Sequence, residues 1–182
     1  MADAVSQNPA LQFRLATAQD AAAVAALVQS AYRGAASQQG WTTEADFLEG
    51  QRTDAAGVLE AINNPDSAIV LAEYAGEFRA SALIEQHGAD CHFGMFAVRP
   101  TLQSSGIGKA LLAECERRAR ADFACVRMVM WVIWLRESLI AFYARRGYAV
   151  SAQRQPFPYG DERFGLPLRD DLYFIVMIKD LG

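Results

Sequence analysis

The stretch VRPTLQSSGIGKALLAEC, residues 98–115, carries the strongest structural signal in the sequence. A proline breaks an apolar, strand-like run, and Gly106 and Gly108 then open a segment whose apolar residues, from Ile107 to Cys115, recur at helical spacing. Glycines at a strand-to-helix turn let the backbone approach a ligand closely, and a helix start presents free amides with partial positive charge. The stretch predicts either a pyrophosphate cradle or a tight turn that packs the helix closely.

Two better-known phosphate-binding patterns do not match this stretch. Lys109 directly follows the last glycine, so the four-residue gap and the Ser or Thr of a Walker motif are missing. Ala110 and Leu111 come next, and the preceding strand belongs to an expected antiparallel meander, whereas the dinucleotide fingerprint needs GxGxxG in a parallel βαβ unit. Neither of these two nucleotide-binding motifs is therefore predicted.

Hydrophobic periodicity and turn residues place further elements on both sides of this helix. The expected strands are 12–15, 67–74, 78–86, 91–98, 126–133, 148–152 and 172–179, and the other expected helices are 21–33, 43–49, 55–63 and 138–146. This order predicts a mixed α/β (α+β) fold with an antiparallel middle. We expect residues 1–10 to form a flexible N-terminus and residues 11–182 to form a single domain.

Length and composition agree with one folded domain and exclude several classes of protein. The 182 residues are 52% hydrophobic and 21% charged, which is too apolar for intrinsic disorder. The formal net charge of −4 argues against nucleic acid or an anionic membrane as the main partner. No run of about 18 uncharged apolar residues occurs, and residues 1–10 lack a basic, apolar leader, so neither a membrane span nor a signal peptide is expected.

The cysteines and histidines indicate reduced thiols rather than a metal centre. Cys91, Cys115 and Cys125 are an odd number without the spacing of a disulfide framework, which is typical of a cytoplasmic protein. The only histidines are His87 and His92, and no CxxC occurs, so we expect no metal site.

A second motif, FYARRGY at residues 142–148, follows the glycine-rich stretch. Together, QSSGIG at 103–108 and this motif resemble the Q/RxxGxG/A and fYxxxGF motifs of the GCN5-related N-acetyltransferase (GNAT) superfamily, with Tyr148 in the phenylalanine place. The resemblance is specific over residues 98–148 and extends over about 11–180 by element order. It implies the acyl-CoA N-acyltransferase fold, a mixed central sheet flanked by helices, and a transferase that uses acetyl-CoA.

The resemblance also implies where acetyl-CoA binds. Amides after the Gln position would hold the pyrophosphate, and the end of the preceding strand would leave its neighbour and pair with the pantetheine arm. The residues concerned are Phe96, Ala97, Val98, Gln103, Ser104, Ser105, Gly106, Ile107, Gly108 and Lys109. Arg136 stands where the family often has a cofactor-binding asparagine, so it either reaches the cofactor or turns outward as surface charge.

Two residues are candidates for proton transfer. The resemblance places Tyr143 near the thioester sulfur, where a phenol with a pKa near ~10 could protonate a thiolate with a pKa near ~8.5. The alternative for Tyr143 is a core aromatic. Glu85 is the first candidate for the base that takes the amine proton, and it should share a strand face with Ser81 and Leu83. A solvated strand-end carboxylate, or a water chain along backbone carbonyls, are the alternatives.

Acceptor contacts are expected in two additions to the core, residues 35–64 and the loop at 155–171. In the family the acceptor site comes from the first helices and late loops, which here offer Tyr32, Trp41, Glu44, Arg52, Tyr159 and Asp161. If the acidic residues converge they would favour an amine cation, whereas Arg52 and Arg163 could clamp a carboxylate. The sequence leaves both open.

The predicted activity is acetyl transfer from acetyl-CoA to a primary amine, on a small molecule, by direct attack in a ternary complex. A non-catalytic acyl-CoA sensor and a protein or N-terminal acetyltransferase are the alternatives, and the filled loop at 156–165 argues against an open peptide groove. Dimers are common among proteins of this kind, so a homodimer is one expected assembly.

Overall fold

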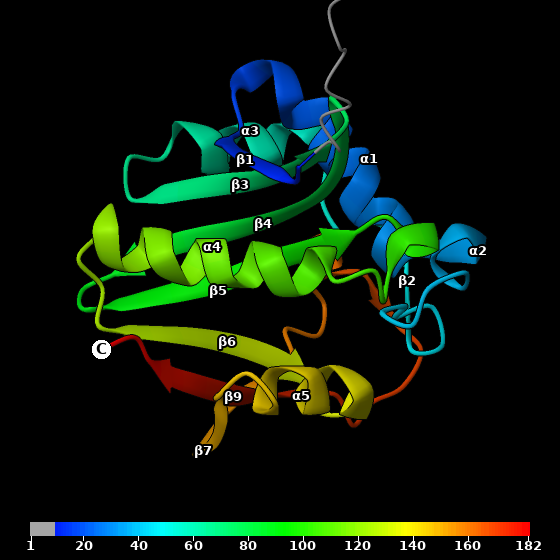
Figure 1. The fold of residues 1–182 in the computed structure, drawn as a ribbon. Coiled ribbons are helices and arrows are strands. Elements are labelled where there is room, and N and C mark those ends of the chain that lie inside the picture. The colour runs from blue at the N-terminus through cyan, green and yellow to red at the C-terminus, as the bar shows by residue number, and fades with distance from the viewer. Residues whose placement is uncertain (1–9) are drawn as a thin grey trace, which may run out of the picture.

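A seven-stranded sheet forms the centre of the computed structural model, which describes residues 10–182 (Figure 1). The strand order is β1-β3-β4-β5-β6-β9-β7, and every pair is antiparallel except β5 with β6. The strands are β1 (Gln12–Leu15), β3 (Ser67–Tyr74), β4 (Glu77–His87), β5 (Asp90–Val98), β6 (Arg127–Ile133), β7 (Ala149–Pro156) and β9 (Tyr173–Asp180). Apart from Ala10, the predicted N-terminal segment 1–10 lies outside the described residues.

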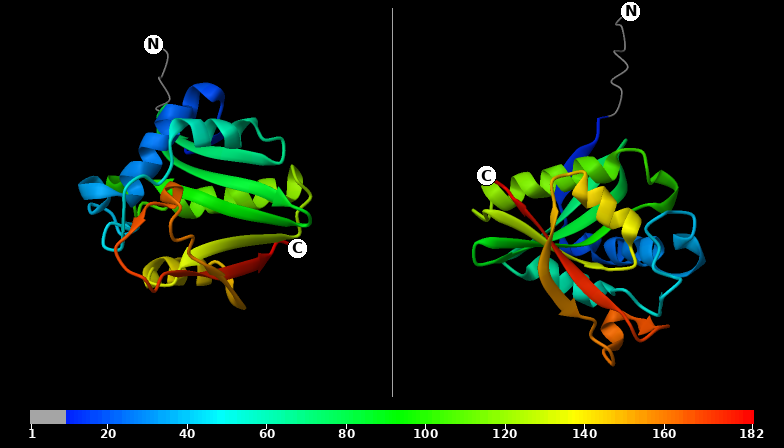
Figure 2. Two further views of the ribbon diagram at one scale, coloured as in Figure 1. Left: turned by 180° about the vertical axis from the view of Figure 1, so that it is seen from behind. Right: turned by 90° about the horizontal axis from the view of Figure 1, so that it is seen from below.

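Helices cover both faces of the sheet. One face carries α4 (Ile107–Ala121) and α5 (Glu137–Ala144), and the other carries α1 (Ala21–Tyr32) and α3 (Ala55–Asn63) (Figures 1 and 2). The short helix α2 (Gly34–Ser37) follows α1, and single 3₁₀ turns lie at Ala18–Asp20, Pro100–Leu102 and Glu162–Phe164. The described fold is thus a three-layer arrangement, as the predicted mixed α/β class requires.

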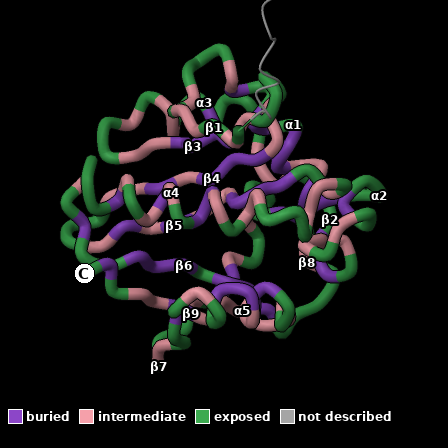
Figure 3. Tube along the Cα trace, in the orientation of Figure 1, coloured by how far each residue is buried: buried purple, intermediate pink, exposed green. Residues whose placement is uncertain are grey.

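Side chains alternate between the two faces along the central strands. On β4, Ala82 and Ile84 belong to the core under α4, whereas Leu83 packs on the core under α1. The most buried stretches of chain run through β3 to β6, in the middle of the sheet (Figure 3). Glu85 lines a cavity together with Leu83, which confirms that these two residues share a strand face.

Strands β5 and β6 pair only where they begin. Their parallel register joins Asp90–His92 to Arg127–Val129, and no pairing between them continues beyond this point in the described chain. On its other side, β5 carries an irregularity: Ser81 faces Ala97 and Leu83 faces Gly94, so two residues of β5 lie opposite one residue of β4. Met95, one of these two, has a φ of +43°. Such a bulge bends the strand and redirects its backbone groups.

The helix predicted over 43–49 is wrong. Leu48 donates to the Glu44 carbonyl at 2.9 Å, which completes a single turn. The chain then forms the short strand β2 (Leu48–Glu49), which pairs with β8 (Leu166–Pro167). Seen from behind, segment 45–52 and the chain after β7 lie side by side (Figure 2). Pairing with a distant segment has therefore overridden the local helical pattern.

The other predicted elements are confirmed with small shifts at their ends. Helix α5 begins one residue early, at Glu137, and β7 runs on to Pro156 instead of ending at 152. Helix α1 ends at Tyr32, just before Gly34 with its φ of +67°, as expected, although the short helix α2 begins at Gly34 itself. No helix within residues 10–182 has the length and apolar character needed to span a membrane.

The packing of α4 on the sheet can be tested by a matched pair of substitutions. Leu111 on α4 is 0% exposed, whereas Leu59 on α3 is 36% exposed. We expect Leu111→Ala to lower the free energy of unfolding by about 2.7–5 kcal/mol, because it leaves a cavity in the core. Leu59→Ala should cost about 1 kcal/mol or less. Urea denaturation measures both, and equal losses would contradict this description of the core.

Candidate active site

Three cavities follow one another through the opening between β5 and β6. A cavity of about 550 Å³ lies at the start of α4 and beside α5, and a groove of about 340 Å³ lies on the opposite face, between β4, β5 and β6. Between them, a narrow cavity of about 60 Å³ is lined from α1 by Tyr32 and from α5 by Tyr143. Since these helices cover opposite faces, the narrow cavity lies between the two sides of the sheet, and it shares Phe96 with the first cavity.

The first cavity contains most of the glycine-rich loop. Gly106 has a φ of +90° and precedes α4, and Ser104 has a φ of +72°. A Cβ at Gly108 would lie 3.1 Å from Cζ of Phe96, so any larger residue there would require the Phe96 ring to shift away from α4. The first amides of α4 have no carbonyl partner inside the helix, so they remain available to an anion.

The lining of this cavity includes both predicted and unpredicted residues. Of the predicted contacts, it contains Phe96, Val98, Gln103, Ser104, Gly106, Gly108 and Lys109. Ala97 is buried in the core under α1 instead, Ile107 packs on the core under α4, and Ser105 is exposed in the loop. Sequence reasoning missed Ser138, Phe142, Arg145 and Arg146, which also line the cavity. The FYARRGY motif contains three of these four, Phe142, Arg145 and Arg146.

The side chain of Gln103 holds a neighbouring segment in place. Its Oε1 accepts a hydrogen bond from the Trp41 amide at 2.8 Å, and its Nε2 donates to Thr42 Oγ1 at 2.8 Å. Trp41 and Thr42 both line the first cavity, and the Trp41 ring lies 5.8 Å from the Phe142 ring. Trp41, predicted at the acceptor, is therefore placed at the wall of the first cavity.

Tyr143 lies in the narrow cavity and is buried. Burial raises the pKa of its phenol well above the ordinary value, and the nearby Tyr32 acts in the same direction. The phenol therefore stays protonated at neutral pH. Tyr143 also packs against Phe93 and Phe96, so it is both a core aromatic and a cavity residue. The two sequence-based interpretations of Tyr143 are compatible.

Tyr32 supports the bulge in β5. Its hydroxyl donates to the Phe96 carbonyl at 2.5 Å, from the opposite face to α5. Two guanidinium groups lie over its ring, with the Cζ atoms of Arg136 and Arg52 at 5.1 Å and 5.5 Å from the centroid. Tyr32 thus joins the splayed strand to a cluster of arginines.

Glu44 is the centre of a buried ion-pair network. Its Oε2 pairs with Nη1 of Arg33, and its Oε1 pairs with Nη1 of Arg136 at 2.9 Å. Arg136 also donates to the Thr42 carbonyl at 2.7 Å, and Arg33 donates to the Phe164 carbonyl at 3.3 Å. Burial alone would raise the pKa of Glu44, but Arg136, Arg52 and Arg33 outweigh it and hold that pKa below the usual value.

Arg136 turns inward in this network. Its side chain is only 9% exposed, so the alternative of a surface charge is excluded. It lines the narrow cavity beside Tyr143 rather than the first cavity. Arg33, which sequence reasoning missed, has the least exposed side chain of the three charged residues in the network. A charged residue at the end of α1 gave no local signal, because its partners Glu44 and Phe164 belong to other segments, 11 and 131 residues along the chain.

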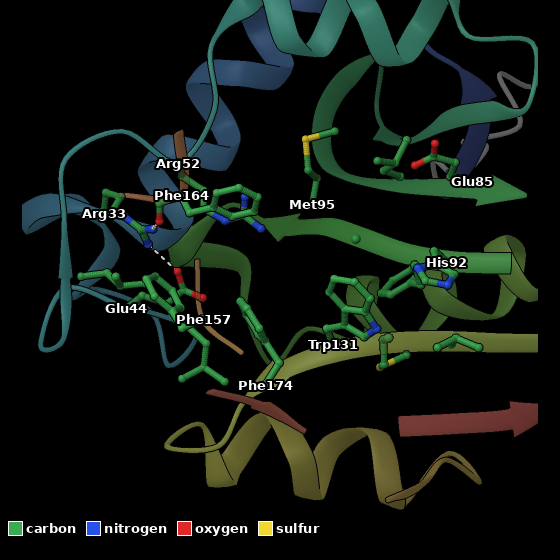
Figure 4. A pocket seen from close by; sticks show the side chains of 17 residues that line it. Arg33, Glu44, Arg52, Glu85, His92, Met95, Trp131, Phe157, Phe164 and Phe174 are labelled. Atoms are coloured by element: carbon green, nitrogen blue, oxygen red, sulfur yellow. Dashed lines mark hydrogen bonds and ion pairs between the residues drawn. The ribbon is translucent and has the colours of Figure 1, made fainter. Parts of the chain in front are cut away.

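The groove on the other face has two polar ends and an apolar middle. Figure 4 shows Arg33, Glu44 and Arg52 at one end, and Glu85 and His92 at the other. Leu83, Phe93, Met95, Trp131, Phe157, Phe164 and Phe174 line it between these ends. The groove therefore offers charge at its ends and an apolar surface for the body of a ligand.

Glu85 and Tyr143 line different cavities. Glu85 pairs in register with His92, at the point where β5 and β6 are still joined, whereas Tyr143 lines the narrow cavity. The Glu85 carboxylate lies 3.4 Å from Nδ2 of Asn64 and 3.6 Å from Nε2 of His87. It is partly exposed to the groove.

Tyr159 and Asp161 belong to the structure of their own loop. The Tyr159 hydroxyl accepts from the Leu172 amide at 2.7 Å, and Asp161 caps a 3₁₀ turn and pairs with Arg163. Neither lines any of the three cavities. The loop contributes through Phe157 and Phe164 instead, so its aromatic content was the useful signal.

The histidines and cysteines show no metal centre in the part of the chain that is described. No group of three or more His, Cys, Asp or Glu side chains within residues 10–182 is placed to hold a metal ion. The rings of His87 and His92 are tilted by 44° with centroids 4.4 Å apart, and the His92 ring lies 5.6 Å from the ring of Trp131. Cys91, Cys115 and Cys125 are free and buried.

Comparisons with known proteins agree with this geometry. A sequence model of the acetyltransferase (GNAT) family matches residues 23–148, which is more than half of the chain. No curated protein sequence matches the chain.

Three solved structures illustrate the similarity of fold. A GNAT-family protein from Desulfovibrio desulfuricans has a TM-score of 0.69 and 19% identity, covering 95% of this chain and 100% of its own. The protein yncA of Salmonella typhimurium, solved with its cofactor acetyl-CoA, has a TM-score of 0.69 and 19% identity, covering 95% of each chain. The ribosomal-protein-S18-alanine N-acetyltransferase from Escherichia coli has a TM-score of 0.66 and 16% identity, again covering 95% of each chain.

Glu44 is expected to be the most sensitive charged position in the site. We expect Glu44→Gln to lower the free energy of unfolding by about 3–5 kcal/mol at pH 7, since it leaves two buried guanidinium groups without their carboxylate. Asp46→Asn, an exposed acidic position in the same turn, is the control and should cost about 0.5 kcal/mol or less. Chemical denaturation measures both.

The pH dependence gives a second readout for Glu44. Because its folded-state pKa lies below the usual value, the ionised form stabilises the fold above the unfolded pKa near ~4.3. That contribution is lost as the pH falls through the folded-state pKa. The difference in stability between the wild type and Glu44→Gln should therefore shrink in acid. A difference that stays constant from pH 7 to the lowest pH at which both fold would contradict the ion-pair description.

The cysteines are expected to react slowly in the native protein. Burial, together with the neighbouring Cys125, raises the pKa of the Cys91 thiol to about 12, and burial raises the pKa of Cys115 and Cys125 as well. Only the thiolate is nucleophilic. At pH 8 we expect Ellman's reagent to react far more slowly with the native protein than with protein unfolded in guanidinium. A thiol that reacts at the unfolded rate would contradict this and would supply a candidate acyl carrier.

Proposed function

Since the chain belongs to the GNAT acetyltransferase family, whose members use acetyl-CoA, we propose that it acetylates the primary amine of a small molecule by direct attack in a ternary complex. One observation carries the proposal: two cavities on opposite faces of the sheet meet at a narrow cavity lined by a buried tyrosine. A donor and an acceptor can enter from opposite faces and meet without leaving the protein. Holding both reactants in one complex supplies much of the rate.

The first cavity fits coenzyme A. Its anionic groups would bind at the free amides that open α4, with Lys109, Arg145 and Arg146 as cationic neighbours. Beyond His92, the side of β5 that faces β6 is not paired with that strand, although the other side still pairs with β4. Its backbone groups can therefore bind the pantetheine arm. When bound, acetyl-CoA supplies the thioester carbonyl that the amine attacks. The glycine at 108, which a Cβ would push against Phe96, keeps α4 close to this edge.

We propose Tyr143 as the general acid. The amine nitrogen forms its bond to the acetyl carbon as the carbon–sulfur bond breaks, and the sulfur leaves with the electron pair. Tyr143 lines the narrow cavity and keeps its proton because burial raises the pKa of the phenol. It can therefore give that proton to the leaving sulfur and avoid release of a free thiolate.

We propose Glu85 as the base, acting through water. The amine must lose a proton, and the groove contains two carboxylates, Glu44 and Glu85. Both oxygens of Glu44 are engaged by arginines, and its pKa is held below the usual value, which makes it a poor proton acceptor. Glu85 faces no arginine partner in the described ion pairs and is 35% exposed. Its place at the far end of the groove requires a water between it and the amine.

The size of the groove favours a small acceptor over a protein. Its volume is about 340 Å³, and Leu48 of β2 together with Phe157 and Phe164 of the late loop form part of its wall. The fold by itself does not decide, because the similar Escherichia coli enzyme acts on a ribosomal-protein alanine. A cytoplasmic location and a homodimer remain predictions from the sequence.

Removal of the Tyr143 hydroxyl tests the proposed reaction. We expect Tyr143→Phe to lower kcat by about 10²–10⁴-fold, with little change in the affinity for coenzyme A, because the acid is lost and the cavity shape is kept. Release of free thiol from acetyl-CoA, measured against a broad panel of amines, reports kcat. Calorimetric titration with coenzyme A reports binding.

Tyr148→Phe is the matched control. Tyr148 is also buried, but its hydroxyl donates to Glu116 at 2.8 Å and lines none of the three cavities. We expect a loss of stability of about 1 kcal/mol and an unchanged kcat. If Tyr143→Phe turns over as fast as the wild type, the acid role is refuted. If the wild type binds coenzyme A and releases no thiol with any amine, the protein is a sensor and the proposed activity is wrong.

A further inference from the structure

We propose that the acceptor carries three groups: the amine that is acetylated, a carboxylate and an apolar side chain. Arg52 binds the carboxylate. The inference rests on the proposed function, because it assigns the substrate class of the same groove. It concerns the charged end of the groove, where Arg33, Glu44 and Arg52 meet (Figure 4).

The charges at this end do not balance. The three arginines Arg33, Arg52 and Arg136 surround the single carboxylate of Glu44. Glu44 forms ion pairs with Arg33 and Arg136. Arg33 also donates a hydrogen bond to the Phe164 carbonyl, and Arg136 donates one to the Thr42 carbonyl. A partly buried excess of positive charge is costly unless an anion offsets it. The groove is therefore built to receive one.

Arg52 is the arginine left to bind that anion. It takes part in none of the ion pairs found among residues 10–182, and its guanidinium stands over the Tyr32 ring at 5.5 Å. Arg52 lines both the groove and the narrow cavity, so it reaches the place where donor and acceptor meet. A guanidinium presents a planar fork of donors that matches the two oxygens of a carboxylate.

The rest of the groove selects an apolar body. Phe93, Trp131, Phe157, Phe164 and Phe174 form its walls, and Met95 adds a side chain that adapts to irregular shapes. A volume of about 340 Å³ is at the small end of ligand sites. An amino acid with an aromatic or aliphatic side chain combines an amine, a carboxylate and an apolar body within this size.

The same charges also help the amine to react. An acceptor amine near the narrow cavity lies close to Arg52 and Arg136, and positive neighbours lower the pKa of an ammonium group. The neutral, nucleophilic form is thereby favoured. A polycationic acceptor without a carboxylate would be repelled by these arginines and would gain no ion pair with Arg52. Its binding is therefore expected to be weak.

Matched acceptors test the inference. Phenylalanine and phenethylamine share the amine and the aromatic side chain and differ in the carboxylate, and leucine and 3-methylbutylamine form a second pair. We expect the wild type to favour the member with the carboxylate by about ten- to hundredfold in kcat/KM, the range of a charge-assisted hydrogen bond. Arg52→Gln should remove that preference, and Arg52→Lys should restore part of it. Comparing variants cancels the difference in amine pKa between the members of a pair.

A binding measurement separates recognition from turnover. With the enzyme saturated with coenzyme A, calorimetric titration should show phenylalanine binding to the wild type and a loss of about tenfold or more in Arg52→Gln. Arg117→Gln removes an exposed arginine of α4 outside the three cavities and should change neither measurement.

Each remaining outcome has a distinct meaning. Equal kcat/KM for both members of each pair in the wild type would refute the proposal that the site recognises a carboxylate, and it would leave the proposed acetyltransferase activity intact. Equal losses for both members in Arg52→Gln would show that Arg52 only supports the groove, which also overturns the inference. Binding of coenzyme A without turnover of any amine, carboxylate-bearing or not, would refute the proposed function itself.

Discussion

The early end of the pairing between β5 and β6 is the constraint on which the site depends. These parallel strands share three residue pairs and then separate, although β5 continues to Val98 and β6 to Ile133. A parallel strand pair that separates part of the way along loses ladder hydrogen bonds, so the separation must be held by other contacts. The separation makes room for the narrow cavity between the two faces. It also leaves an unpaired strand edge in the middle of the sheet rather than at an edge strand.

The contacts that hold this separation come from both faces. From one side, Tyr32 bonds to the Phe96 carbonyl at the bulge of β5, and from the other, Tyr143 and Phe142 pack against the Phe96 ring. The ion pairs of Glu44 then tie the end of α1 to the start of α5 through Arg33 and Arg136. Buried ion pairs add little net stability compared with apolar packing, but they specify orientation. We infer that this network sets the relative position of the two helices that line the narrow cavity.

Local signals in the sequence were sufficient for the core and for the glycine-rich loop. The turn at Gly106 and the face of α4 follow from backbone freedom and helical period, which depend only on neighbouring residues. The failures share one cause. The segment 43–49 has a helical pattern but pairs with β8, and Trp41, expected at the acceptor, is held at the first cavity by the side chain of Gln103. Contacts between distant segments decided both, and one sequence does not reveal them.

The expected acceptor residues show the same limit of local signals. Tyr159 and Asp161 were attractive because polar and aromatic side chains in a long loop often bind ligands. Their partners are instead Leu172 and Arg163, within the same loop or at its end. Arg33 had no such local signal, yet it is one of the most buried charges in the molecule, because Glu44 reaches it across the end of α1.

The net charge of the chain and the charge of the site have opposite signs. The formal total is −4, but that total is spread over solvated carboxylates whose fields are screened within about 8–10 Å. The arginines around Glu44 act at short range and partly out of water, where a charge pair interacts several times more strongly than at the surface. An amine held there experiences the local field and not the total. An acceptor that brings its own carboxylate offsets this field at Arg52 while its amine is kept neutral. The acidic composition and an acidic acceptor are therefore compatible.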